Sequence, residues 1–195
     1  MSTTGQLVMW SDLTTQSQSR SSDAHNGQIF AVCTRPHDPH VDVFSTSADR
    51  RIGRWRLSTA GPAKLVSWWT TSIAGFPSSS EALPDAPDEF AVCFGDGALS
   101  LVKVRREGDH TVSSSVHLSQ TGLSRQHPTC VHPVPGGDAD ELVDILVGTK
   151  VGLGLLITAN KRTGEWVDTF TSPQKRESSV RQVAWVEHSR RTKGE

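Results

Sequence analysis

The segment Phe44–Leu57 reads FSTSADRRIGRWRL, in which an apolar strand leads through a polar turn into a second apolar strand. The same order recurs in Phe90–Val104, which reads FAVCFGDGALSLVKV, and in Ile145–Ile157, which reads ILVGTKVGLGLLI. An aspartate occupies the turn of the first two copies, whereas Val151 stands there in the third. A unit of short strands that recurs at about 40–50 residues is typical of a β-propeller blade.

Strand-like runs dominate the rest of the chain, because β-branched and aromatic residues lie between Gly, Pro, Ser and Asp with little helical periodicity. The stretch Gly75–Asp88, rich in Pro, Ser and Ala, is predicted to be an exposed loop between two strands of one blade, and Ser11–Asn26 is also predicted to be a loop. The predicted strands are Gln6–Trp10, Gln28–Cys33, Asp42–Thr46, Ile52–Leu57, Leu65–Thr71, Glu89–Phe94, Leu99–Val104, Val112–Leu118, Thr129–Val131, Val143–Val147, Leu153–Ile157, Glu165–Phe170 and Val180–Val186.

These strands predict an all-β fold, a partial WD-repeat β-propeller with about three complete blades and flanking strands. The predicted blades span residues 28–72, 66–120 and 128–172. Propeller blades are expected over residues 1–187, and a charged tail over 188–195. Closed propellers have about four to eight blades, so we expect the chain to be a piece of a longer propeller protein or a truncated product of one.

The composition of the chain limits which classes of partner and which cellular locations are expected. The chain has 20 basic and 21 acidic residues, so no global field indicates a nucleic acid or a membrane as partner. It contains no apolar run of 18 residues and no signal-peptide pattern at its N-terminus, so we expect no membrane segment and an intracellular location. The three widely spaced cysteines fit buried thiols in a reducing compartment better than a disulfide framework.

The order of several segments resembles the WD-repeat region of the gem-associated protein five family, which contains the RNA-recognition subunit of the SMN complex. The resemblance depends on the order and spacing of segments, since each motif also occurs in other WD-repeat proteins. The matching segments are Gly5–Thr14, His25–Cys33, Ser45–Arg50 with Trp55, Gly95–Gly97, His132–Pro133, Gly148–Thr149 and Ser179–Trp185.

The sequence also departs from the usual repeat pattern. Arg56 follows Trp55 where an aspartate is usual, Val151 replaces a turn aspartate, and the Gly-His dipeptide is absent. These departures call into question the side-chain hydrogen-bond network that is typical of well-formed blades.

The resemblance implies binding of small nuclear RNA, at the Sm site and the methylguanosine cap, for spliceosomal particle assembly. It also implies SMN-complex proteins as partners and a cytoplasmic and nuclear location, including nuclear bodies. No cofactor and no small-molecule substrate are expected. A protein-only WD-repeat scaffold is the alternative function.

The resemblance assigns RNA contacts to three residues. Phe30 matches an aromatic that lies at the start of an opening strand, where it would stack on a base, although it could equally be a core residue of its own strand. Arg20, in the polar loop Thr14–Asp23, matches a basic position near the RNA, and its alternative is a solvated arginine. Pro128 and Arg181 occupy the places that correspond to Phe30 in later blades.

Other residues were weighed for chemistry. Arg50, Arg51, Arg54 and Arg56 form a local basic cluster that could contact phosphate but fits a solvated blade surface better. His37 and His40 suggest a metal site, but the proline between them and the lack of further clustered ligands argue against one. No catalytic signature is present, so an enzyme is not expected.

Overall fold

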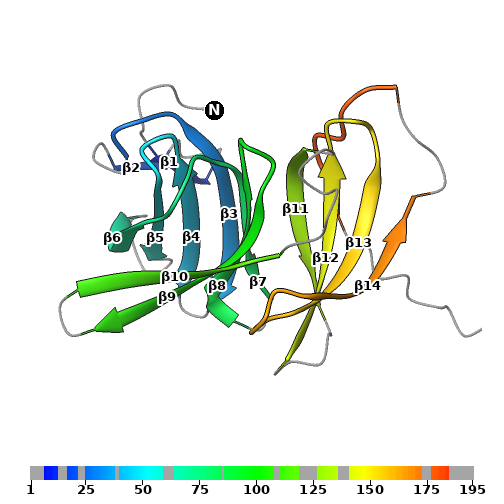
Figure 1. The fold of residues 1–195 in the computed structure, drawn as a ribbon. Coiled ribbons are helices and arrows are strands. Elements are labelled where there is room, and N and C mark those ends of the chain that lie inside the picture. The colour runs from blue at the N-terminus through cyan, green and yellow to red at the C-terminus, as the bar shows by residue number, and fades with distance from the viewer. Residues whose placement is uncertain are drawn as a thin grey trace, which may run out of the picture.

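The computed structural model describes residues 7–12, 17–21, 25–37, 40–58, 64–84, 86–107, 110–118, 127–135, 141–172 and 177–184. In these residues the regular structure is entirely β (Figure 1). The charged tail predicted over 188–195 lies outside the described residues, as does Trp185. No helix in the described part is long and apolar enough to cross a membrane.

Three four-stranded antiparallel sheets and one two-stranded hairpin make up the described fold. The N-terminal hairpin contains β1 (Leu7–Asp12) and β2 (Ser17–Ser21). The first sheet contains β3 (Ile29–His37), β4 (His40–Ser47), β5 (Arg51–Ser58) and β6 (Lys64–Ser72). The second sheet contains β7 (Pro77–Leu83), β8 (Ala86–Phe94), β9 (Leu99–Glu107) and β10 (His110–His117). The third sheet contains β11 (Pro128–Val134), β12 (Leu142–Thr149), β13 (Gly154–Asn160) and β14 (Trp166–Thr171).

Each sheet is a simple meander whose strands follow one another in chain order. Strand β7 contacts both β3 and β11, so neighbouring sheets meet along their opening strands and fan outward from them (Figure 1). The prediction of an all-β fold with three complete blades is therefore confirmed.

Two apolar layers hold neighbouring sheets together. Between the first and second sheets, the Phe90 ring meets Phe44 and Trp69 edge to face, with ring centroids 5.2 and 6.2 Å apart. Between the second and third sheets, branched aliphatic residues dominate, among them Leu99, Ile145 and Ile157. Both layers come from the side-chain alternation of the strands, which directs every second residue toward the neighbouring sheet.

Strand β7 corrects the prediction of an exposed loop over Gly75–Asp88. Ser80, Ala82 and Leu83 of this strand are buried, and the Ser80 hydroxyl donates to Thr46 Oγ1 of the first sheet at 3.2 Å. Small side chains suit this position, because opening strands of adjacent sheets approach each other closely. The second blade therefore opens at residue 77, and the predicted span of 66–120 was wrong.

The structure also differs from two predictions about the ends of the chain, one of a loop and one of a strand. The polar stretch Ser11–Asn26 contains β2, which pairs with β1 in an antiparallel register, so Arg20 lies in a strand opposite Val8. Conversely, residues 180–184 carry no assigned strand, although the sequence predicted one over Val180–Val186. The Val180 N–H still donates to the Thr149 carbonyl at 2.9 Å, so this segment lies beside the third sheet.

Candidate nucleic-acid interface

Phe30 lies in a β-bulge at the start of β3. Ile29 pairs with Ser47 and Ala31 with Thr46, so Phe30 is the unpaired residue. A bulged residue is re-aimed relative to the regular pleat, and such bulges often occur beside functional sites. The Phe30 side chain is half-buried, and it belongs to none of the three buried apolar clusters of the described residues.

The same bulge recurs in the other two opening strands, where the unpaired residues are Ser78 and Thr129. The structural counterpart of Phe30 in the third sheet is thus Thr129, not the predicted Pro128, which is buried and matches Ile29. Ser78 Oγ donates to the Cys93 carbonyl at 3.3 Å, and Thr129 Oγ1 lies within donating distance of two carbonyls, that of Gly148 at 3.1 Å and that of Val180. Phe30 cannot make this bond and presents an aromatic ring instead.

The turn of each sheet's middle hairpin lies at the same end as these bulges. Backbone N–H groups of Ala48, Gly95 and Lys150 donate to carbonyls of the residues two places before the bulges, at 2.8–2.9 Å. Those acceptor residues are Gln28, Phe76 and His127. We call this end of the sheets the rim.

Phe76 is an exposed aromatic on the rim that the sequence analysis did not single out. Its side chain is 61% exposed, and the Arg50 guanidinium lies 5.3 Å from the ring centroid. Arg50 is itself exposed and has a φ of 61°, so the turn directs it away from the regular strand path. The sequence does contain a signal for this position: a glycine precedes Gln28 and another precedes Phe76, so the two residues can be aligned as equivalent places in successive sheets.

The three predicted RNA contacts occupy different elements. Phe30 lies at the rim of the first sheet, and Arg181 is exposed beside the rim of the third sheet, next to Val180, whose N–H binds the Thr149 carbonyl. Arg20 lies near the end of β2 that leads into β3, and its side chain is outside the described part. Phe30 and Arg181 therefore lie at the rims of two different sheets, and Arg20 lies in the N-terminal hairpin.

A buried hydrogen-bond network supports the rim of the first sheet. His25 Nδ1 lies 3.1 Å from both carboxylate oxygens of Asp49, and His25 Nε2 lies 2.8 Å from Ser45 Oγ. Trp55 Nε1 donates to the same Ser45 Oγ at 2.8 Å. Asp49 also accepts the backbone N–H groups of Asn26 and Arg51. The sequence analysis questioned whether this side-chain network forms, and for the first sheet that expectation is wrong. His25 makes its hydrogen bonds there although no glycine precedes it.

The geometry of this network favours a neutral imidazole. Trp55 can only donate, so the Ser45 hydroxyl can donate to His25 Nε2 while His25 Nδ1–H donates to Asp49. Burial lowers the pKa of His25, although the neighbouring Asp49 carboxylate opposes this shift, and Arg51 adds to the lowering. The neutral network holds the 48–50 turn in place and thereby positions Arg50.

The turns of the other sheets use simpler side-chain bonds. Asp96 Oδ1 accepts the backbone N–H of Ala98 at 3.0 Å. Thr149 Oγ1 both accepts the N–H of Leu153 and donates to its carbonyl, each at 3.0 Å. The loss of the turn aspartate at Val151 is therefore offset locally by a threonine hydroxyl.

One arginine of the cluster at residues 50–56 is internal, which corrects the interpretation of the whole cluster as a solvated surface. Arg54 is buried and pairs with Asp42 at 2.6 Å in its own sheet and with Asp88 at 2.8 Å in the second sheet. Arg56 also approaches Asp42 at 3.5 Å, and Arg51 donates to Thr70. Of the four arginines, Arg50 alone is exposed.

These pairs set the charge state of Asp42. Burial by itself would raise the pKa of Asp42, but hydrogen bonds and charge from Arg54, with a contribution from Arg56, lower it overall. Asp42 is therefore ionised, and Arg54 connects the first sheet to the second.

No group of three or more His, Cys, Asp or Glu side chains among the described residues could hold a metal ion. His37 and His40 face each other across the β3–β4 pair, and their side chains lie outside the described part.

Comparison with known proteins tests the fold. No protein-family model matches the chain, and no curated protein matches it in sequence. Among solved structures, the β-propeller domain of Cps50 (Swd1) from Myceliophteria thermophila matches with a TM-score of 0.62 at 17% identity. The match covers 91% of this chain and 51% of that domain, so this chain spans about half its length. Together with the three meandering sheets, this similarity shows that the chain adopts a partial β-propeller fold.

Proposed function

We propose that this propeller is a non-enzymatic scaffold that binds small nuclear RNA through the rim of its sheets. In this proposal the Sm site or the methylguanosine cap is the part of the RNA that is recognised, as the resemblance to the gem-associated protein five family implies. SMN-complex proteins would be partners, and the protein would act in the cytoplasm and the nucleus.

The observation that carries the proposal is the bulge position of Phe30. In the second and third sheets this place holds a small hydroxyl residue that satisfies a backbone carbonyl. A half-buried phenylalanine there forgoes that bond and adds nothing to the described apolar clusters. A base stacked on such a ring contributes about 1–3 kcal/mol.

Cations near the same end of the sheets supply the second part of the proposed mechanism. Arg50 and Arg181 are exposed at the rim, and Arg20 lies near the rim end of β2. Arginine can pair with phosphate oxygens in a bidentate manner or stack on a base. Phe30 would hold one base while these arginines neutralise the adjacent phosphates.

A protein-only scaffold is the second candidate function. The near balance of basic and acidic residues favours it, because the chain as a whole does not attract a polyanion. A propeller that binds only proteins predicts no RNA affinity that depends on the rim.

The test is fluorescence anisotropy with a capped small nuclear RNA fragment that contains an Sm site, titrated with the full chain. Phe30→Ala is expected to weaken binding roughly tenfold through lost stacking, and Arg20→Ala or Arg181→Ala by less. Phe170→Ala is the matched control, because Phe170 is 63% exposed but lies in the outer strand β14. Binding should also weaken steeply as salt rises.

Two results would favour the protein-only scaffold. One is the absence of measurable binding to the unsubstituted chain. The other is an affinity that Phe30→Ala and Phe170→Ala change equally.

A further inference from the structure

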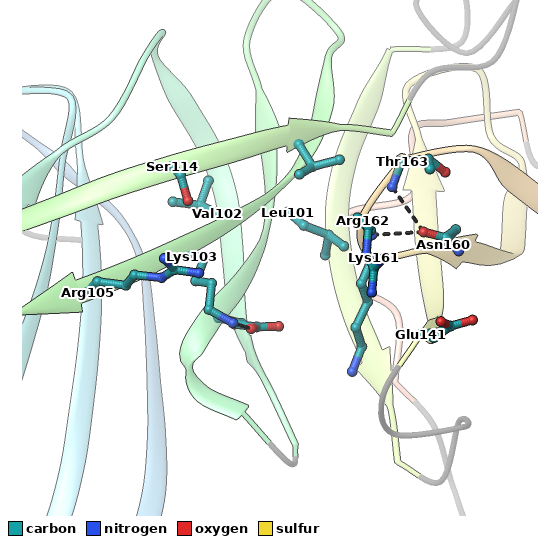
Figure 2. Close-up of a pocket in the computed structure, with 12 residues that line it drawn as sticks. Leu101, Val102, Lys103, Arg105, Ser114, Glu141, Asn160, Lys161, Arg162 and Thr163 are labelled. Atoms are coloured by element: carbon teal, nitrogen blue, oxygen red, sulfur yellow. Dashed lines mark hydrogen bonds and ion pairs between the residues drawn. The ribbon is translucent and has the colours of Figure 1, made fainter.

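A groove of about 580 Å³ opens between the second and third sheets (Figure 2). Its residues come from β8, β9 and β10 on one side, and from Glu141 and residues 160–163 on the other. The groove contains none of the rim residues Phe30, Arg50 or Phe76. It is therefore a separate surface from the one proposed to bind RNA.

One wall follows from the register of β9 and β10. Leu101 pairs with Val116, Lys103 with Ser114 and Arg105 with Val112, so these pairs form successive rows on one face. Leu101 is buried in the apolar layer between the two sheets, whereas Lys103 and Arg105 are exposed. Along this face of β9 the groove lining therefore changes from the apolar Leu101 to the basic Lys103 and Arg105.

The facing wall is the turn between β13 and β14, and its backbone is held in place. Asn160 Oδ1 accepts the N–H groups of Arg162 and Thr163 at 2.8 and 2.9 Å (Figure 2). Gly164 has a φ of 75°, and a Cβ added there would lie 2.0 Å from the His117 carbonyl oxygen of β10. The turn is packed directly on the second sheet, so this end of the groove is preformed.

The groove carries excess positive charge on a chain whose net charge is −1. Its basic side chains are Lys103, Arg105, Lys161 and Arg162, and its acidic ones are Glu89 and Glu141. Lys103 forms an ion pair with Glu89, its cross-strand neighbour. Arg105 and Arg162 are exposed on the opposite walls.

The lining favours a peptide over a nucleic acid. It contains no aromatic side chain on which a base could stack, whereas single-stranded nucleic acids are typically held by aromatic platforms in a basic groove. The apolar pair Leu101 and Val116 instead suits an aliphatic side chain.

We infer that this groove binds an extended acidic segment of a partner protein. Carboxylates of the segment pair with Arg105 and Arg162 on the two walls, and an apolar side chain between them covers Leu101 and Val116. Because the walls are held by backbone bonds and sheet packing, little conformational entropy is lost by the groove on binding.

The experiment measures anisotropy of a fluorescein-labelled peptide of alternating glutamate and leucine, titrated with the full chain. The double variant Arg105→Glu/Arg162→Glu is compared with the matched rim variant Arg50→Glu/Arg181→Glu. Reversal of the two groove charges should weaken peptide binding roughly tenfold, since it removes two exposed charge pairs and adds repulsion. The rim variant should bind the acidic peptide with the same affinity as the unsubstituted chain.

Three additional arms complete the test. A peptide with glutamine in place of glutamate should bind much more weakly, and binding of the acidic peptide should fall as ionic strength rises. The milder variant Arg105→Gln/Arg162→Gln, checked by circular dichroism and thermal unfolding, should also lose affinity, which excludes misfolding as the cause. An oligouridylate competitor should leave the peptide bound.

The inference is overturned if the acidic peptide does not bind the unsubstituted chain. It is also overturned if the groove and rim variants lose equal affinity, or if the RNA competitor displaces the peptide and loses affinity with the groove substitutions. Because RNA binding is tested separately with Phe30→Ala, failure of the groove proposal is distinguishable from failure of the RNA proposal.

Discussion

His25 and Asp49 are 24 residues apart in sequence, yet the imidazole Nδ1 lies 3.1 Å from both carboxylate oxygens. This contact connects the segment before β3 to the turn between β4 and β5. Through Ser45 and Trp55 it extends into the buried face of the first sheet. The rim of that sheet is therefore held by side chains as well as by backbone bonds.

The substitution His25→Ala is expected to lower the free energy of unfolding by about 1–3 kcal/mol, because it leaves buried polar groups of Ser45 and Asp49 without their partner. Urea denaturation followed by circular dichroism measures the change. His127→Ala is the matched control, since His127 is exposed at the equivalent end of the third sheet. Equal effects of the two substitutions would contradict a role for the network.

The pKa of His25 predicts a pH dependence of stability. The folded pKa is lowered by burial below the ordinary value of 6.5, so the unfolded chain binds the proton more readily. The contribution is fully present above about pH 6.5 and is lost as pH falls toward the folded pKa. Chemical denaturation between about pH 8 and pH 5 should show this decline.

The control for this pH dependence is His25→Gln, which removes the titrating group. The decline in stability below about pH 6.5 should be smaller in this variant. The folded pKa of Asp42 is lowered below 3.8, so its contribution is lost only in a more acidic range. An unchanged pH profile in His25→Gln would assign the decline to other groups.

The substitution Arg54→Ala is expected to destabilise the fold by about 3–5 kcal/mol, because it removes the closer ion-pair partner of the buried Asp42 carboxylate and leaves only Arg56 at 3.5 Å. Asp88→Ala removes the other ion pair of Arg54, but its side chain is 49% exposed, so the cost should be about 0–1 kcal/mol. Thermal unfolding of both variants measures the difference. A larger loss from Asp88→Ala would show that the contact between sheets outweighs the buried pair.

The substitution Gly164→Ala is expected to cost at least about 1–3 kcal/mol, since the residue has a positive φ and faces the His117 carbonyl oxygen. Gly95→Ala is the matched control, because the nearest contact of an added Cβ there is 3.8 Å away and no positive φ is involved. Denaturant midpoints of the two variants should differ clearly. Similar midpoints would mean that the β13–β14 turn moves away from β10 without cost.

Strand positions could be predicted where apolar residues alternate with polar ones, as in β4, β5, β9 and β12. The prediction failed for β7, whose Ser-rich start resembles a loop, because burial beside the neighbouring opening strands overrides its weak strand propensity. The bulge at Phe30 was also beyond local patterning, since it depends on the register with β4.

The residues of the candidate sites likewise fall into those that the sequence could nominate and those that it could not. The aromatic at Phe30 and the basic residues Arg20 and Arg181 could be nominated through the resemblance to the gem-associated protein five family. The burial of Arg54, the exposure of Phe76 and the Arg50 contact to its ring could not, because each depends on a neighbouring sheet or turn.

The sequence alone determined that this protein is built from repeated antiparallel strands, because side-chain alternation and turn residues act over a few positions. Only the tertiary structure decided which charges are internal and which face solvent. Packing of one sheet on the next buries Arg54 against Asp42 and leaves Arg105 and Arg162 on the walls of a groove. Such placement depends on contacts between residues far apart in the chain, which no local pattern encodes.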